Sequence, residues 1–107
     1  MKYIGNILYD EKLSCETKKL IIFGAGVYGR RILRYLDING IKHHVICFCD
    51  SDRTMDGKYI DGIPVRYAED VCRKYLDADY LISGKYMKEM YQALKEKSIE
   101  KIHILFF

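Results

Sequence analysis

The sequence lacks an apolar run long enough to cross a membrane, and its start lacks the continuous apolar core of a signal peptide. A membrane helix needs about 18 or more apolar residues in succession, and no segment approaches that length. The first six residues include a lysine, a glycine and an asparagine. These absences predict a protein with no membrane span and favour a cytoplasmic location.

Charge of one sign is not concentrated in any block of the sequence. Its 18 Lys and Arg residues and 15 Asp and Glu residues give a net charge of +3, and the two signs are interspersed along the chain. A protein that follows a nucleic-acid backbone needs clustered basic residues to neutralise phosphates. The sequence therefore does not favour nucleic acid as a partner.

The sequence also lacks a C-x-x-C pair, which is the spacing typical of structural zinc sites. Cys47 and Cys49 lie two positions apart in an apolar segment, so a strand places both thiols on one face, as small buried hydrophobic groups. His43 and His44 are neighbours that would face opposite ways in a strand, and we interpret them as solvated loop residues. No metal site is predicted. The four cysteines are Cys15, Cys47, Cys49 and Cys72.

The most informative segment present is an apolar run, 19–23, that breaks into the pattern Gly24-x-Gly26-x-x-Gly29 and then into helical periodicity. This order predicts a strand, a tight turn and a helix. In such a turn the first glycine permits the backbone turn, the second allows a phosphate to approach, and the third allows close contact between helix and strand. The start of the helix then attracts an anion through its free N–H groups and its dipole.

The segment after the glycine pattern strengthens this interpretation. Its apolar helix positions end at Asn39-Gly40, which is typical of a left-handed cap. An apolar strand at 44–49 follows and ends in Asp50, which lies 21 residues after Gly29. This spacing is close to the offset of about 20 residues at which a carboxylate meets the ribose hydroxyls in dinucleotide-binding folds. The apolar positions of the helix are Ile32, Leu33 and Leu36.

The remaining sequence continues the alternation of strands and helices. We predict an α/β fold of the Rossmann-like type, a three-layer parallel sheet of about five strands in the order 3-2-1-4-5. It occupies 19–107 as one domain, and a leading amphipathic segment, 1–18, forms a short helix. The further elements are a β excursion ending in an edge strand at 63–65, a helix from Ala68 with Tyr75 and Leu76 on its buried face, a strand at 79–83, a helix burying Met87, Met90, Tyr91 and Leu94, and a strand at 101–107.

In this strand order the ligand crevice opens where the order reverses, between the first strand and the strand at 79–83. Ser83 and Lys85 then lie opposite the glycine pattern. Lys85 would offset phosphate charge, and Ser83 would donate a hydrogen bond. The predicted binding residues are Gly24, Ala25, Gly26, Tyr28, Gly29, Asp50, Ser51, Asp52, Ser83 and Lys85.

Several of these residues together resemble a known family. The segment 23–29, the acid pair Asp50 and Asp52, and the segment 57–65 with its Gly-Ile-Pro-Val element resemble the N-terminal nucleotide-binding domain of sugar-modifying proteins of bacterial surface polysaccharide synthesis. These include sugar O- and N-acyltransferases and nucleotide-sugar dehydratases or epimerases. The resemblance covers 19–107. It implies that the glycine turn binds a nucleotide or nucleotide-sugar phosphate and that Asp50 meets the ribose or base, with Asp52 as a second candidate.

The sequence departs from that family because it has neither the hexapeptide-repeat acyltransferase domain nor the second half in which dehydratases and epimerases keep their catalytic residues. No catalytic residue is therefore predicted. We interpret the chain as a module that binds NAD or a nucleotide-sugar, accessory to sugar-nucleotide or polysaccharide metabolism, as a homo-oligomer or with a catalytic partner. Asp50 favours NAD over NADP, and Arg53 opposes that preference. The alternatives are a small NAD-dependent oxidoreductase or epimerase completed by a partner, and a structural domain without a ligand.

Overall fold

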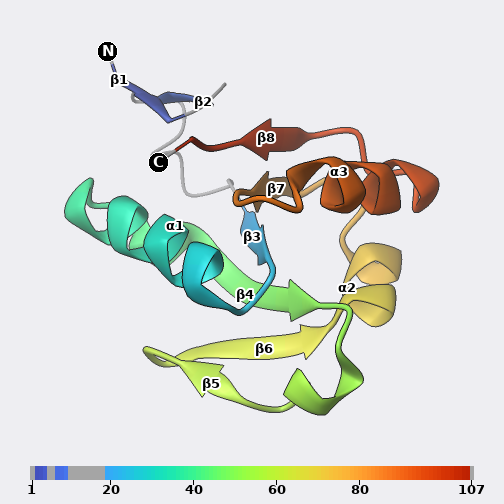
Figure 1. Cartoon of the computed structure of the whole chain (residues 1–107). Helices are drawn as coiled ribbons and strands as arrows, with labels where there is room; N and C mark the ends of the chain where they lie inside the picture. Colours follow the sequence, from blue (N-terminus) through green and yellow to red (C-terminus); the bar gives the residue numbers. More distant parts are fainter. Residues whose placement is uncertain (1, 5–6, 10–18, 107) are drawn as a thin grey trace.

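The computed structural model describes residues 2–4, 7–9 and 19–106. Residues 19–106 form a mostly parallel sheet with α1 on one side and α2 and α3 on the other, and residues 2–4 and 7–9 form a separate two-stranded sheet (Figure 1). The strands are β1 (Lys2–Ile4), β2 (Ile7–Tyr9), β3 (Leu20–Phe23), β4 (Val45–Asp50), β5 (Tyr59–Ile60), β6 (Ile63–Tyr67), β7 (Asp79–Ile82) and β8 (Ile102–Ile104). The helices are α1 (Val27–Ile38), α2 (Ala68–Lys74) and α3 (Met87–Glu96), with short 3-10 turns η1 (Lys42–His44) and η2 (Arg53–Met55).

The main sheet has six strands in the order β5-β6-β4-β3-β7-β8. The five parallel strands, β6-β4-β3-β7-β8, keep the predicted order, and β3 lies at the centre where the order reverses. The strand count differs from the prediction because β5 adds an antiparallel edge strand. Consequently β6, which contains Pro64, is not the edge. Its registered pairs with β4 begin at Val65, so the N–H that proline lacks lies outside that ladder.

Apolar side chains of the sheet alternate between two core clusters. Ile22 and Phe48 face the cluster that α1 covers, whereas Ile21 and Cys49 face the cluster covered by α2 and α3. All four residues of β3 are buried, because both faces of a central parallel strand are covered. This confirms the three-layer architecture. Cys47 and Cys49 share one cluster, as their spacing predicted.

The glycine-rich connection and α1 follow the predicted pattern. α1 buries Gly29, Ile32, Leu33 and Leu36 along one face. The helix ends at the predicted cap, where Gly40 has a φ of +80° and its N–H donates to the carbonyl of Asp37 at 3.0 Å. The polypeptide then returns to the sheet through η1.

Four further local predictions are wrong. Residues 2–4 and 7–9 pair as antiparallel strands rather than as part of a helix, and 10–18 lie outside the described residues. The Gly5-Asn6 pair between the two runs is a sequence signal for a hairpin, which the helical interpretation overlooked. His44 is only 4% exposed, because η1 turns its side chain inward. Leu76 and Tyr91 are 53% and 40% exposed, since α2 ends at Lys74 and the buried stripe of α3 centres on Leu94.

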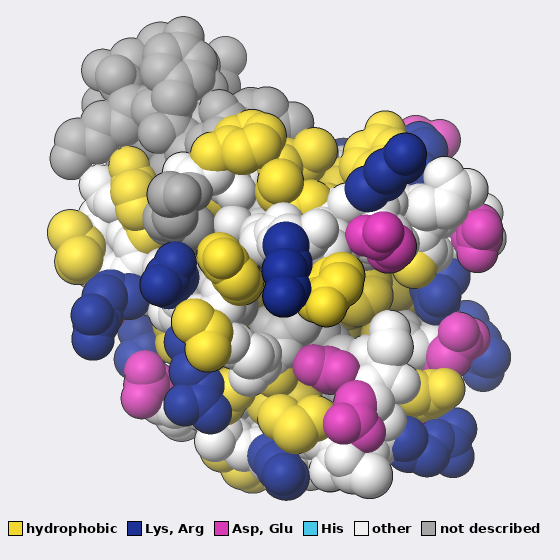
Figure 2. All heavy atoms as spheres, in the orientation of Figure 1, with side chains coloured by type: hydrophobic (Ala, Val, Ile, Leu, Met, Phe, Trp, Pro, Cys, Tyr) yellow, Lys and Arg dark blue, Asp and Glu magenta, His cyan; other side chains and the backbone are white. Residues whose placement is uncertain are grey.

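The surface agrees with the interspersed charge of the sequence. On the face shown in Figure 2, acidic side chains lie among the basic ones over the described part of the chain. No helix within the described ranges is long and apolar enough to span a bilayer.

Candidate functional site: the glycine turn between β3 and α1

The turn that follows β3 begins with a residue that must be glycine. Gly24 has a φ of +98°, a conformation that side chains rarely adopt. Its N–H donates to the carbonyl of Cys49 on β4 at 2.7 Å. The chain therefore turns over the carboxyl end of the sheet while it stays bonded to the neighbouring strand.

The other two glycines of the pattern have opposite environments. A Cβ atom at Gly29 would overlap the carbonyl oxygen of Gly24, so Gly29 allows α1 to pack on the turn. A Cβ atom at Gly26 would meet nothing within 4 Å among the described residues, and Gly26 is exposed. Packing within the described structure therefore explains Gly29 but leaves Gly26 unexplained. An approach of a ligand to the backbone would explain it.

Gly26 is also the residue that caps the start of α1. It supplies no side chain to the first-turn N–H groups, and the first turn carries no acidic residue. The N–H groups of a first helical turn have no acceptor within the helix. An exposed helix start of this kind attracts anions through these N–H groups and through the helix dipole.

Asp50, the last residue of β4, lies next to this turn. One carboxylate oxygen accepts the N–H of Ala25 at 2.9 Å, and the other accepts the N–H of Asp52 at 2.8 Å. The side chain is half-buried. Asp50 thus lies where the sequence predicted, and in this structure its carboxylate braces the glycine turn against the loop after β4.

Ser51 and Asp52 follow Asp50 in the loop after β4. Both are exposed, and the Asp52 carboxylate accepts hydrogen bonds from the Thr54 N–H at 3.0 Å and the Thr54 hydroxyl at 2.7 Å. These hydrogen bonds lower the pKa of Asp52. Asp52 therefore caps η2, and its contacts are within its own loop.

A cavity of about 250 Å³ lies beside the turn, at the carboxyl ends of β3 and β7. It brings together six of the predicted residues with side chains from α3 and the turn after β7. Asp50, Ser51 and Asp52 do not line it. The lining residues are Phe23, Gly24, Gly26, Val27, Tyr28, Gly29, Ser83, Gly84, Lys85, Tyr86 and Met90.

The two side chains predicted from the β7 end differ in what they can offer. The Ser83 hydroxyl is buried and donates to the carbonyl of Leu105 at 2.7 Å, so the hydroxyl expected to bind a ligand is already bonded to the residue that follows β8. Lys85 is exposed, and its Nζ lies 5.3 Å from the centre of the Tyr86 ring. Lys85 is thus the cation of this cavity that can meet an anion.

Sequence reasoning missed five lining residues, which are Phe23, Val27, Gly84, Tyr86 and Met90. The Met90 methyl group lies 3.2 Å from the position that a Cβ atom would take at Gly24. Its spacing on α3 marked it as a core residue, and it does pack partly against the core. No local sequence signal shows that α3 also reaches over the glycine turn.

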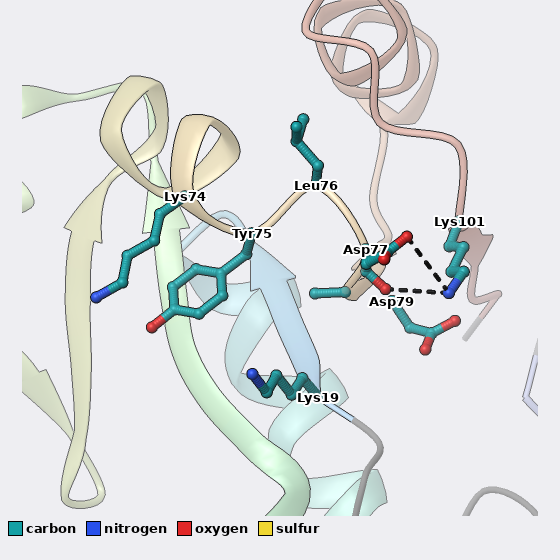
Figure 3. A pocket seen from close by; sticks show the side chains of 8 residues that line it. Lys19, Lys74, Tyr75, Leu76, Asp77, Asp79 and Lys101 are labelled. Atoms are coloured by element: carbon teal, nitrogen blue, oxygen red, sulfur yellow. Dashed lines mark hydrogen bonds and ion pairs between the residues drawn. The ribbon is translucent and has the colours of Figure 1, made fainter.

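Larger cavities lie elsewhere, and one of them is lined mainly by charged side chains. The amino-edge cavity, about 530 Å³, lies where β3 and β7 begin and is lined by Lys19, Lys74, Tyr75, Leu76, Asp77, Ala78, Asp79 and Lys101 (Figure 3). Lys101 is 3.9 Å from the carboxylate of Asp77, and Asp79 is 2.8 Å from Nε2 of His103. The ammonium groups of Lys19 and Lys74 lie 5.8 and 5.3 Å from the centre of the Tyr75 ring.

The cysteines of the described residues belong to the core. Burial raises the pKa of Cys47 to about 11, and the hydrogen bond with Cys72, together with burial, raises the pKa of Cys49. Raised values keep both thiols protonated at neutral pH. Within the described ranges, no group of three or more His, Cys, Asp or Glu side chains is arranged to hold a metal ion.

Solved structures share this architecture. The chain is 24% identical to UDP-D-quinovosamine 4-dehydrogenase from Vibrio fischeri, with a TM-score of 0.61 over 79% of this chain and 75% of the dehydrogenase. It is 21% identical to RSP, a Rex-family repressor, with a TM-score of 0.60 over 80% of this chain and 44% of the repressor. RSP in complex with β-NADH gives 20% identity and a TM-score of 0.61, over 82% of this chain and 45% of RSP.

These likenesses establish the fold, and the chain spans less than half the length of the repressor. No curated protein matches the sequence. The family model described as C2185-like, N-terminal, matches residues 16–105, which include the glycine turn and every strand of the main sheet. The chain therefore belongs to the C2185-like N-terminal family.

Proposed function

We propose that this chain is a nucleotide-binding module that holds the diphosphate of NAD or of a nucleotide-sugar against the glycine turn. The observation that carries the proposal is the contrast between two glycines. At Gly29 the carbonyl of Gly24 leaves no room for a Cβ atom, whereas at Gly26, at the start of α1, the space is free of other described residues. A turn needed only for packing requires the first contact and not the second. Bare backbone at an exposed helix start suits a diphosphate.

Asp50 supplies the second part of the site. Each of its carboxylate oxygens accepts one backbone N–H, from Ala25 or Asp52. A carboxylate oxygen has about two acceptor positions. Asp50 therefore retains capacity for a ribose hydroxyl while it fixes the turn that meets the diphosphate.

The same carboxylate favours NAD over NADP, since a 2′-phosphate would meet like charge beside Asp50. Arg53 is near in sequence, but its guanidinium lies 4.5 Å from the centre of the Tyr67 ring. Arg53 is thus engaged with an aromatic face, which reduces its availability to a 2′-phosphate.

The solved relatives support this class of ligand. RSP was crystallised with β-NADH, and the Vibrio fischeri relative is named a UDP-sugar dehydrogenase. We propose that this chain serves sugar-nucleotide or surface-polysaccharide metabolism in the cytoplasm, as a homo-oligomer or with a partner that supplies catalysis. Of the other predicted binding residues, Ser83 and Lys85 line the cavity beside the turn, whereas Ser51 and Asp52 do not. Lys85 is the one that would meet a phosphate, because it is exposed and carries positive charge.

Isothermal titration of the full chain with NADH, NADPH and UDP-glucose tests the proposal. We expect binding that weakens stepwise in Gly26→Ala and Gly26→Val, because the added side chain enters the space of the diphosphate. Circular dichroism and the unfolding midpoint check that both variants keep the fold. Lack of binding at millimolar concentration, or binding that Gly26→Val leaves unchanged, contradicts the proposal and favours a structural domain without a ligand.

A further inference from the structure

The first turn of α1 places an aromatic ring across the cavity beside the glycine turn. Tyr28 precedes Gly29, and its ring lies against Gly84 in the turn after β7. A Cβ atom at Gly84 would be 2.7 Å from Cδ2 of Tyr28 and 2.9 Å from its Cγ. Gly84 also has a φ of +102°. The ring therefore contacts bare backbone at the end of β7, and a side chain at position 84 would displace it.

A second contact holds the same ring in place. The guanidinium carbon of Arg31 lies 5.1 Å from the centre of the Tyr28 ring, within the range of a cation–π interaction. Tyr28 is thus fixed between its own helix and the turn after β7, and 39% of its surface remains exposed. It forms a wall that joins the start of α1 to the end of β7.

The position of this wall bears on the length of the ligand. In doubly wound folds a dinucleotide lies across the crevice where the strand order reverses, with one nucleoside on each side. Here the reversal lies between β3 and β7, and Asp50 marks the side of β4. The ring stands on the other side. The cavity there is about 250 Å³, below the range of about 300–1,000 Å³ typical of ligand pockets.

We infer that Tyr28 is a specificity-determining residue that restricts the site to ligands with one nucleoside, attached to a diphosphate. This rests on the proposed function, because it assumes that the diphosphate lies on the glycine turn. The nucleoside then lies on the side of Asp50. The group beyond the diphosphate meets Lys85 and Tyr86 at the cavity rim, where the Tyr28 ring limits the space left for a second base.

ADP-ribose and NADH separate this inference from the proposed function, since the two ligands differ by the nicotinamide alone. By calorimetry, we expect the unaltered chain to bind ADP-ribose at least about tenfold more tightly than NADH. In Tyr28→Ala the ratio of the two affinities should fall to within about twofold, because NADH gains space. Tyr28→Phe keeps the ring and should keep the ratio. Tyr59→Ala, an exposed tyrosine on edge strand β5, is the matched control.

Two results overturn the inference while the proposed function stands. One is an unaltered chain that binds NADH as tightly as ADP-ribose. The other is a loss of NADH affinity in Tyr28→Ala without a loss of ADP-ribose affinity, which would make Tyr28 a stacking partner for the base. If Tyr28→Ala does not fold, Tyr28→Leu, which shortens the wall and keeps an apolar contact, replaces it. An unaltered chain that binds neither ligand contradicts the proposed function, and the inference with it.

Discussion

The two ends of the parallel sheet carry cavities of opposite character. At the carboxyl ends of β3 and β7, a hollow of about 250 Å³ is bordered by the bare backbone of the glycine turn. The amino-edge cavity is about twice as large, at about 530 Å³, and is bordered mainly by charged side chains. Several of these charges already have partners, such as Asp77 with Lys101 and Asp79 with His103.

The volume of a cavity therefore does not by itself identify the binding site. Backbone N–H groups at a helix start are fixed before a ligand arrives, whereas long side chains must be ordered on binding. At the amino edge Lys19 and Lys74 lie on long flexible stems over Tyr75. The cavity at the carboxyl end is therefore the better preorganised of the two for binding an anion.

The largest expected effect is on stability at the glycine turn. Gly29→Ala should lower the free energy of unfolding by about 3 kcal/mol, because its Cβ atom overlaps the carbonyl of Gly24. Gly26→Ala should cost about 1 kcal/mol or less, through the poorer helix cap. Urea unfolding of both variants measures the difference. Equal losses of unfolding free energy in the two variants would show that packing also leaves no room for a side chain at Gly26.

Alkaline pH should destabilise the protein through Cys47. The pKa of this thiol is raised from 9.0 to about 11 in the folded state, so folding favours the protonated thiol. Its contribution is complete below the unfolded pKa and is lost as pH rises from about 9 to about 11, by up to about 2–3 kcal/mol. Unfolding of the unaltered chain and of Cys47→Ala across this range measures it. If the free energy of unfolding falls equally in both proteins over this pH range, Cys47 is not the cause.

Removal of one carboxylate from each end of the sheet should have unequal effects. Asp50→Ala removes the acceptor of the Ala25 and Asp52 N–H groups and should cost about 1.5–2 kcal/mol. Asp77→Ala removes an exposed carboxylate 3.9 Å from Lys101 and should leave the free energy of unfolding unchanged within error. Chemical denaturation compares the two. A larger loss in Asp77→Ala would reverse the ranking of the two ends.

The smallest effects are expected from the lysines. Lys85→Ala should weaken binding of ADP-ribose a few-fold, because Lys85 is the exposed cation at the cavity beside the turn. Lys19→Ala and Lys74→Ala remove the same charge at the amino edge and should leave the affinity within about twofold. Titration calorimetry measures the affinity of all three variants for ADP-ribose. Equal losses would indicate a ligand held by overall charge.

The sequence predicts most of the fold because its main elements have strong local patterns. β3 is a fully buried apolar run, and α1 shows apolar spacing and ends at Gly40. The predicted β excursion includes 58–60, but β5 was not expected as the edge strand, because Tyr59–Ile60 is two residues long and has no periodicity of its own. His44 was misplaced because its burial depends on tertiary packing of η1.

The residues of the candidate site also fall into two groups. Some can be recognised from the local sequence, and others depend on tertiary contacts. The glycine pattern and Asp50 are visible in sequence because the requirements of the backbone turn are local. The partner of Ser83, the carbonyl of Leu105, lies 22 residues away, and Met90 reaches the turn through the packing of α3. The contact of Tyr28 with Gly84 joins two distant turns. Such contacts depend on tertiary packing between segments that are distant in the sequence.

The place of the diphosphate on the glycine turn can be observed directly, from the change in backbone amide resonances when ADP-ribose is added to isotopically labelled protein. We expect the amides of Gly26, Val27 and Tyr28 to shift most and those of Ala25 and Asp50 to shift less, while the amides around Lys19 and Tyr75 stay unchanged. If instead the largest shifts occur at the amino-edge cavity and the glycine turn is unaffected, the diphosphate does not bind at the glycine turn.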